Sequence, residues 1–317
     1  MLQWLEDKVQ GFGHNGPKGT YILNVEPNPK SLFELLCDNL KNAREKYGVI
    51  IPWYIMTSRE NNIQTIKFFE ENNYFEYPKQ AITFFMQGEL PMVDKNGKML
   101  INEEGLIKEA ADGHGGIFEA MFKNSIVDDM IKRKIEWVFI GPIDNPLAKM
   151  VDEILIGITK DRNFLEAGKS LVKASPEERV GVFCKKNGRP SVIEYTEITE
   201  QMAKQLDENN NLVYGESHIN CNLFNIKGIE IIGNDKLPYH SALKKASYLD
   251  ENGNVVKPEE PNSYKFESFI FDAFNKLEDM VILRVKREEE FAPVKNKEGV
   301  DSPETAIKLC NEYYNKN

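Results

Sequence analysis

The chain has 317 residues, and its 40 Lys and Arg against 50 Asp and Glu give a formal net charge of −10. A net negative field disfavours non-specific binding to nucleic acid and to anionic membrane surfaces. Hydrophobic residues make up 41% of the chain and aromatic residues 10%, a content that excludes a disordered protein and supplies an ample core.

The first predicted elements are a loop and a helix. Glycines and a proline crowd residues 11–19, which are therefore expected to form a turn-rich loop. Ser31 and Glu34 have the spacing of a capping box, which predicts a helix with Ser31 as its N-cap and Glu34 reaching back. Leucines then follow at helical spacing until Gly48, which ends the pattern.

Strand and helix patterns alternate through the rest of the first half. Short apolar runs predict buried strands at residues 49–56, 81–86 and 135–143. Apolar residues at helical spacing predict helices at residues 63–72 and 116–132. Helices that alternate with continuous apolar strands are typical of a doubly wound α/β sheet.

The second half is richer in strand patterns. Residues 180–185 and 191–195 flank the turn Lys186-Asn-Gly188 and predict a β-hairpin. Residues 219–226 and 281–285 are further strand candidates. We expect these strands to extend the first sheet and to form one wall of a cleft.

Two glycine-rich loops could bind an anion. Residues 13–19 combine glycines with Lys18, and residues 112–116 (DGHGG) precede a predicted helix. Backbone amides next to glycine, a lysine ammonium and a helix N-terminus all suit a phosphate or a sugar hydroxyl. The first loop does not have the GxxxxGK[ST] spacing of a P-loop. A surface turn and a helix-entry turn are the structural alternatives for the two loops.

Three charged residues are further candidates. Asp144 follows the clearest strand, and ligands of open α/β sheets bind beyond the carboxyl ends of strands, where one carboxylate suits Mg²⁺. Glu194 lies in a strand-like run, and Lys295 follows an acidic cluster. The alternatives are a turn residue for Asp144, a solvated strand face for Glu194 and a surface salt bridge for Lys295.

The compartment can be inferred from the cysteines and the N-terminal segment. The four cysteines lie far apart without a CxxC motif, so structural zinc is not expected. No positively charged leader with an apolar core opens the chain, and the apolar stretches are shorter than the roughly 20 residues of a membrane span. A reduced, cytoplasmic protein is therefore expected.

Taken together, these segments resemble the eukaryotic-type UDP-sugar pyrophosphorylases, and most closely the UDP-N-acetylglucosamine pyrophosphorylase family. The similarity runs in family order from about residue 13 to residue 308. The matching segments are GPKG at 16–19, SLF at 31–33, PWYIMT at 52–57, FMQGELP at 85–91, DGHGG at 112–116, GPIDN at 141–145, VGVFC at 180–184, IEYTE at 193–197, LPYH at 237–240 with Lys244-Lys245, and FAPVKN at 291–296.

The resemblance implies a fold and an activity. The fold would be a Rossmann-like nucleotidyltransferase α/β fold, with a mixed central sheet and added sugar-binding strands. Residues 1–317 would form a single catalytic domain, with its nucleotide-binding part at 13–150 and its sugar-binding part at 151–317. The activity would be transfer of UMP from UTP to a sugar-1-phosphate, N-acetylglucosamine-1-phosphate or a hexose-1-phosphate, with release of pyrophosphate. Mg²⁺ would be the cofactor.

The resemblance also implies roles for single residues. Lys18 and Lys295 would contact the nucleotide and sugar phosphates as catalytic residues, and Asp144 would hold Mg²⁺. The nucleotide-binding residues would be Gln87, which reads the uracil edge, together with Gly113 and His114. The sugar-binding residues would be Gly181, Glu194 and Asn220, with Asn222 as the alternative to Asn220 because the register of residues 218–224 is ambiguous.

Two departures from the family pattern lead to further expectations. The family's LAGGxGTRLG segment is not matched by residues 1–11, so the first strand and most of the phosphate loop are expected to be missing. UDP would then bind weakly, an exposed strand edge would favour self-association, and a degenerate or truncated paralogue with little turnover is the alternative function. His114 also replaces the family's asparagine, and its ring cannot offer the same donor and acceptor pair. A glycosyltransferase would need a DxD metal site, and Asp128-Asp129 is interpreted instead as the end of a helix.

Overall fold

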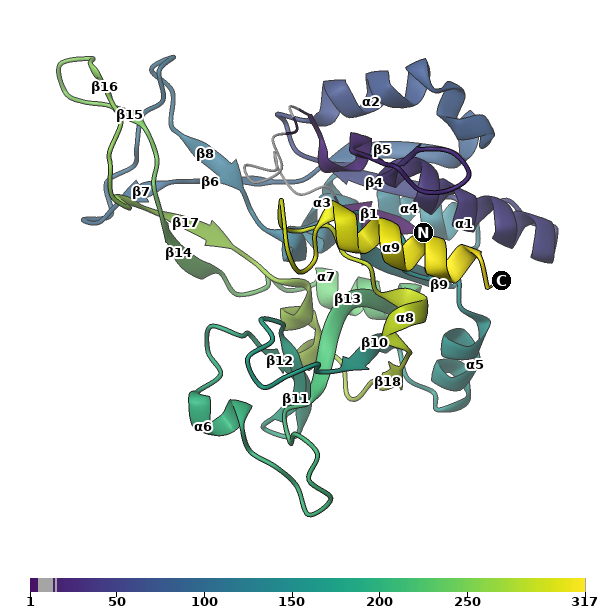
Figure 1. Cartoon of the computed structure of the whole chain (residues 1–317). Helices are drawn as coiled ribbons and strands as arrows, with labels where there is room; N and C mark the ends of the chain where they lie inside the picture. The colour runs from purple at the N-terminus through teal and green to yellow at the C-terminus, as the bar shows by residue number, and fades with distance from the viewer. Residues whose placement is uncertain (5–13, 15, 317) are drawn as a thin grey trace.

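A mixed β-sheet forms the centre of the molecule (Figure 1). The computed structural model describes residues 1–4, 14 and 16–316. Within that part of the chain, nine strands make up the sheet, in the order β12-β11-β13-β9-β1-β4-β5, with β10 paired to β13 and β18 paired to β10. Their bounds are β1 Leu2–Trp4, β4 Trp53–Thr57, β5 Ile82–Met86, β9 Trp137–Pro142, β10 Glu166–Val172, β11 Val182–Lys186, β12 Arg189–Ile193, β13 Glu216–Asn225 and β18 Val281–Arg284.

Strand β1 corrects one expectation drawn from the sequence. The first strand is not missing, because β1 pairs in parallel with β4 on one side and β9 on the other. Leu2 is opposite both Tyr54 and Ile140 in these two ladders. The edges of β4 and β9 are therefore covered, and the argument for self-association through an exposed edge is wrong. The expectation that most of the phosphate loop is missing concerns residues 5–13, which lie outside the described residues.

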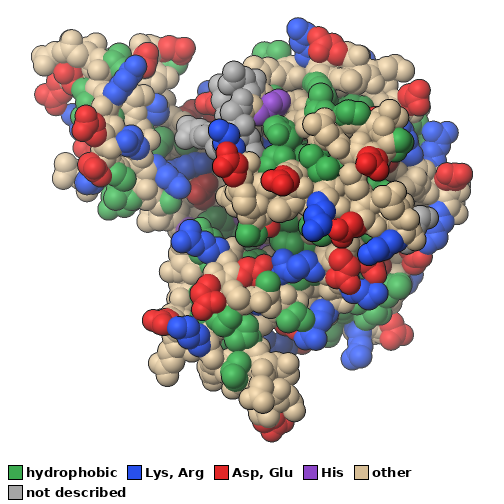
Figure 2. Space-filling model, in the orientation of Figure 1, with side chains coloured by type: hydrophobic (Ala, Val, Ile, Leu, Met, Phe, Trp, Pro, Cys, Tyr) green, Lys and Arg blue, Asp and Glu red, His purple; other side chains and the backbone are tan. Residues whose placement is uncertain are grey.

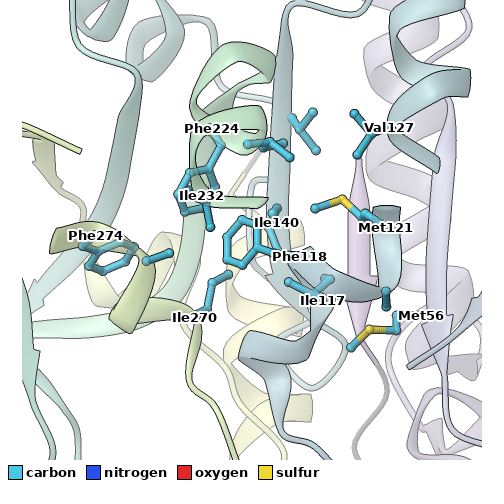
Figure 3. Close-up of a cluster of buried hydrophobic side chains, with 14 of the residues drawn as sticks. Met56, Ile117, Phe118, Met121, Val127, Ile140, Phe224, Ile232, Ile270 and Phe274 are labelled. Atoms are coloured by element: carbon cyan, nitrogen blue, oxygen red, sulfur yellow. The ribbon is translucent and has the colours of Figure 1, made fainter. Parts of the chain in front are cut away.

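Helices cover both faces of the sheet. The residues of β4 alternate between the two layers: Trp53 and Ile55 pack in one buried cluster, Tyr54 and Met56 in the other. The first cluster contains α1 (Leu32–Tyr47), α2 (Asn62–Glu71) and α5 (Glu153–Asp161). The second contains α3 (Ile117–Lys123), α4 (Ile126–Lys132) and α7 (Ile226–Gly233), and Figure 3 shows its side chains converging between these helices and the sheet. The coarse prediction of an α/β protein is thus confirmed.

Local signals in the sequence set several element ends. Ser31 caps α1, since its hydroxyl accepts the Glu34 amide at 3.1 Å, and Gly48 ends α1 with a left-handed φ of 69°. The predicted helix 116–132 is instead two helices, α3 and α4. The break is at Ser125, whose φ of 54° no helix can contain.

An arm projects from the body (Figure 1). It consists of the three-stranded sheet β14-β17-β7 and two ribbons, β6 with β8 and β15 with β16. The strand β6 follows Gln87 and β8 precedes Gly113, so the arm emerges between two predicted nucleotide-binding segments. The bounds are β6 Glu89–Pro91, β7 Val93–Asp94, β8 Glu109–Ala111, β14 His240–Lys244, β15 Tyr248–Leu249, β16 Val255–Val256 and β17 Ser263–Glu267.

The remaining elements close the body. The last helix, α9, packs on α1 and on residues 292–294 in a third buried cluster. None of the helices in the described part of the chain is long and apolar enough to span a lipid bilayer. The remaining bounds are β2 Ile22–Leu23, β3 Lys30–Ser31, α6 Glu200–Ala203, α8 Arg287–Glu290 and α9 Pro303–Tyr314.

Glu166, the first residue of β10, is an acid inside the core. Its side chain is 0% exposed, and neither carboxyl oxygen has a hydrogen-bond partner among the described residues. Burial raises the pKa of Glu166 well above its ordinary value of 4.5, and the charge of Asp279 raises it further. The folded protein therefore holds the Glu166 proton to a higher pH than the unfolded chain does.

We expect the stability of the protein to fall as pH rises above about 5, because the unfolded chain then releases the Glu166 proton while the folded chain keeps it. The contribution of this one proton is up to about 1.4 kcal/mol per pH unit. Glu166→Gln cannot titrate and should lose that part of the slope, whereas Glu177→Gln, at an exposed position, should keep it. Urea unfolding across the pH range measures both; an unchanged slope in Glu166→Gln would show that Glu166 is ionised in the folded protein.

Candidate functional site

A cleft of about 210 Å³ lies beyond the carboxyl end of β9. This is the position that open α/β sheets use for ligands. The cleft brings together residues from seven separate segments of the chain. Those predicted from the sequence that line it are His114, Asp144, Gly181, Glu194, Asn220 and Lys295.

Lys18 and Asp144 form an ion pair at one end of the cleft. The distance from Lys18 Nζ to Asp144 Oδ2 is 3.2 Å, and both residues are buried. Lys18 begins a short 3₁₀-helix, and a side chain at Gly19 would collide with the ring of Phe33, with 2.3 Å from its Cβ to the nearest ring atom. The glycine therefore lets the Lys18 segment pack directly on α1. Lys18 is therefore in direct contact with Asp144, although it is not among the described residues that line the cleft.

Asn145 holds the segment that carries Lys295. Its side-chain amide donates to the Glu290 carbonyl at 2.8 Å and its oxygen accepts the Ala292 amide at 2.9 Å. The Val294 amide donates to the Asp144 carbonyl at 2.9 Å. These bonds fasten the backbone of residues 290–294 to the end of β9, so that the exposed Lys295 follows at the cleft.

His114 links the glycine-rich loop to the opposite wall. Its Nδ1 accepts the backbone N–H of Ile270 at 3.0 Å, which places the ring proton on Nε2. Burial, assisted by the neighbouring His218, lowers the pKa of His114 to about 3. The ring is therefore neutral near pH 7 and serves as a hydrogen-bonding group with no charge.

The other end of the cleft is built from β11, β12 and β13. Asn220 has a left-handed φ of 58° where the register between β10 and β13 shifts, and this irregularity places it in the cleft lining. Asn222, the sequence-based alternative, is fully buried and accepts a hydrogen bond from His218 Nε2 at 3.0 Å. Asn220 is thus the one of the two that lines the cleft.

Gly181 and Glu194 are neighbours across the hairpin. A side chain at Gly181 would have its Cβ 2.8 Å from Val192 Cγ1 and 3.2 Å from Glu194 Oε1. The absence of a side chain at Gly181 is therefore what leaves room for the Glu194 carboxyl. Burial, together with the charge of Glu197, raises the pKa of Glu194.

Gln87 and Gly113 do not line this cleft. Gln87 directly follows β5, and its amide donates to the Thr57 carbonyl at 2.9 Å. Gly113 has a φ of 85°, and a side chain there would have its Cβ 2.4 Å from the Ser268 carbonyl oxygen. Gly113 therefore needs to be glycine in order to turn the chain into His114, which does line the cleft.

Among the lining residues that sequence reasoning did not single out are Arg179, His218 and Phe269. His218 lies in a segment that the family resemblance had already marked, which was the available signal. Burial lowers the pKa of His218 to about 4, so its ring is also neutral near pH 7. Phe269 begins the run FIFDAF, whose apolar pattern predicts only core packing.

Comparisons with known proteins place this site in a family. A family model described as UTP–glucose-1-phosphate uridylyltransferase matches residues 9–301. The chain belongs to this family of UDP-sugar pyrophosphorylases. The resemblance inferred from the motifs is confirmed, and the described cleft lies within the matched part of the chain.

Individual relatives show how similar the chain is to known proteins and how much of each it covers. UDP-N-acetylglucosamine pyrophosphorylase of Saccharomyces cerevisiae is 36% identical over 310 residues, which are 93% of this chain and 64% of the yeast protein. Mouse UDP-N-acetylhexosamine pyrophosphorylase-like protein 1 is 37% identical over 300 residues, 92% of this chain and 59% of the mouse protein. A solved structure from Entamoeba histolytica, named as a candidate UDP-N-acetylglucosamine pyrophosphorylase, has a TM-score of 0.89 at 34% identity and covers 99% of this chain and 81% of its own. The chain thus spans about three fifths of the length of these two curated relatives.

Proposed function

We propose that the protein is a uridylyltransferase that transfers UMP from UTP to a sugar-1-phosphate and releases pyrophosphate. The observation that carries the proposal is the convergence of Lys18, Asp144 and Lys295 at the carboxyl end of β9 in a chain of this family. Two cations beside a carboxylate suit a reaction in which phosphate groups bind and charge moves between them. The names of the yeast and mouse relatives favour N-acetylglucosamine-1-phosphate or a related N-acetylhexosamine phosphate as the acceptor.

In this proposal the reaction needs no protein nucleophile. An oxygen of the sugar-1-phosphate attacks the α-phosphorus of UTP, the new P–O bond forms, and the bond to the leaving pyrophosphate breaks. The protein contributes by positioning both phosphates and by stabilising the charge that develops on them. Lys18 and Lys295 bind phosphate oxygens, and the Lys18–Asp144 contact fixes the direction of the Lys18 ammonium.

A divalent cation fits the donor set at Asp144. No three His, Cys, Asp or Glu side chains gather into a metal cage anywhere in the described part of the chain. One buried carboxylate beside a phosphate site is instead how Mg²⁺ is usually held, with substrate phosphates and waters as its other ligands. Asp144 would hold Mg²⁺, which when bound would draw charge from the phosphate oxygens.

The sugar-binding and nucleotide-binding roles divide along the cleft. Gly181, Glu194 and Asn220 bind the sugar, with the Glu194 carboxyl and the Asn220 amide as hydrogen-bonding groups for its hydroxyls and amide. His114, Gln87 and Gly113 bind the nucleotide, His114 from the cleft side of its loop. Phe269 gives the sugar end of the cleft an apolar wall.

Fold, domains and location complete the proposal. The parallel strands β9, β1, β4 and β5 with helices on both faces support a Rossmann-like nucleotidyltransferase fold and one catalytic domain, with residues 13–150 binding nucleotide and residues 151–317 binding sugar. Charges of both signs are interspersed over the visible face in Figure 2, which together with the net charge of −10 supports a protein without a nucleic acid or membrane partner. All four cysteines lie in the described part of the chain as free thiols, which supports a cytoplasmic location.

A pyrophosphate-release assay with UTP and Mg²⁺ tests the proposal. We expect release with N-acetylglucosamine-1-phosphate or N-acetylgalactosamine-1-phosphate, weaker release with glucose-1-phosphate, and UDP-sugar as the second product. The same panel without Mg²⁺ should give no release. Binding of UTP and UDP-sugar without any pyrophosphate release would contradict the proposal and would identify the chain as a binding protein.

A further inference from the structure

His240 and Asp272 form a hydrogen-bonded pair beside the sugar end of the cleft. His240 is the first residue of β14 in the arm, and Asp272 lies in the 3₁₀-helix Ile270–Lys276. The distance from His240 Nε2 to Asp272 Oδ2 is 2.9 Å, and the Asp272 side chain is 13% exposed. No role for either residue follows from the phosphate chemistry proposed above.

Both members of the pair hold Phe269. Asp272 Oδ2 accepts the backbone N–H of Phe269 at 3.1 Å, which caps the 3₁₀-helix. The His240 ring packs against the Phe269 ring, with centroids 4.7 Å apart and planes tilted by 33°. Asp272 therefore fixes the backbone of Phe269 and His240 fixes its ring.

Phe269 in turn connects the sugar end of the cleft with His114. Its ring lines the cleft and lies 5.4 Å from the ring of His114. The next residue, Ile270, donates its backbone N–H to His114 Nδ1. The consecutive amides of residues 269 and 270 are thus bound by Asp272 and His114, so the wall has one defined position.

The same pair also affects the pKa of Glu194. Burial is the main reason why the pKa of Glu194 is raised, and of the pair Asp272 adds to this rise while the neighbouring His240 opposes it. A change at His240 therefore alters both the apolar wall and the electrostatic surroundings of a predicted sugar-binding carboxylate.

We infer that His240 and Asp272 are a positioning pair for sugar recognition: they hold the Phe269 wall against the sugar-1-phosphate, so that the arm of the protein contributes to the acceptor site. This inference rests on the proposed function. It predicts that losing the pair weakens the sugar-1-phosphate complex while leaving UTP binding nearly unchanged, because Lys18, Asp144 and Lys295 are fastened by separate contacts.

Steady-state kinetics of His240 variants test the inference. In His240→Ala, which removes ring and donor, we expect KM for the sugar-1-phosphate to rise by about tenfold or more and KM for UTP to change by less than about twofold. His240→Gln keeps an N–H donor for Asp272, and His240→Phe keeps the ring, so each should recover part of the loss. For Asp272→Asn we expect a KM for the sugar-1-phosphate between the wild-type value and that of His240→Ala. Ser241→Ala, at the neighbouring exposed position of β14, is the matched control and should behave as wild type.

The outcomes separate the inference from the proposed function. Circular dichroism and thermal unfolding establish whether each variant is folded. If His240→Ala does not fold, the kinetics of Asp272→Asn test the inference instead. Equal increases in KM for both substrates, or a lower melting temperature with unchanged KM values, would overturn the positioning role alone. A folded wild-type chain with no turnover in the sugar-phosphate panel would overturn the proposed function and this inference with it.

Discussion

Replacing Lys295 with methionine is expected to lower kcat/KM for pyrophosphate release by about 10²–10³, the usual loss when one preorganised charge contact to a transition state is removed. The stability of the variant should hardly change. Lys295 is exposed, and the backbone that carries it is held by Asn145 and Asp144, neither of which bonds to the Lys295 side chain. The loss should therefore appear in turnover and leave the melting temperature within about 2 °C of wild type.

Two further variants give this prediction its controls. Lys297→Met removes an exposed charge two residues away and should keep wild-type activity, which excludes a general effect of net charge. Lys295→Arg keeps the charge with a different shape and should recover part of the activity. The pyrophosphate assay and thermal unfolding measure all three proteins. Wild-type kcat/KM in Lys295→Met would mean that another cation binds the phosphates.

The sequence predicts the centre of the site well, because the signals there are local. An uninterrupted apolar run ending in an acid indicates both the buried strand β9 and the position of Asp144 beyond it. The same holds for the hairpin of β11 and β12, where Asn187 and Gly188 have φ values of 54° and 80° that the turn requires. In these places one residue pattern determines one structure.

Strand β10 was not predicted because it contains a buried lysine whose acidic partners lie elsewhere in the sequence. A lysine in its middle argues against burial, yet Lys169 is 0% exposed. Its ammonium lies 2.7 Å from Asp152 Oδ2 and 2.6 Å from Glu290 Oε2, which compensates for the loss of hydration. The two acids are the N-cap residue of α5 and the last residue of α8, and no local pattern connects them with β10.

Strand β1 was missed for a different reason. Residues 2–4 do not match the family motif that indicates a first strand. Parallel pairing, however, uses backbone N–H and C=O groups, which any residue except proline supplies in full. Three residues between β4 and β9 are sufficient to fill the sheet whatever their side chains.

The sugar end of the cleft shows the limit of a motif-based assignment. Motifs identified Gly181, Glu194 and Asn220, which line the cleft, but they included His240 without a role and did not include Asp272 or Phe269. These three residues meet where the arm contacts a 3₁₀-helix, and His240 and Asp272 are 32 residues apart in the sequence. Such contacts are visible only in the folded chain.

Asp144→Asn should abolish Mg²⁺-dependent turnover, with a loss of at least about 10² in kcat/KM, because the amide keeps the shape of the carboxylate but not the charge that a hard cation needs. The amide oxygen can still accept from Lys18 Nζ, so the chain should fold. The substitution removes the negative charge from the buried Lys18–Asp144 ion pair, and we expect the free energy of unfolding to fall by about 2 kcal/mol. Chemical denaturation and a Mg²⁺ titration of turnover measure the two effects separately.

A carboxylate outside the cleft supplies the control for this substitution. Asp129 accepts from the Tyr54 hydroxyl and from Arg133, both at 2.7 Å, and belongs to the pair of acids that a DxD metal site would have used. Asp129 lies in the first turn of α4, so Asp128-Asp129, interpreted from the sequence as the end of a helix, in fact begins one. Asp129→Asn should keep full turnover and an unchanged Mg²⁺ dependence. If Asp129→Asn were inactive and Asp144→Asn active, the metal would bind at α4; because only Asp144 shares a cleft with Lys295 and contacts Lys18, we expect the reverse.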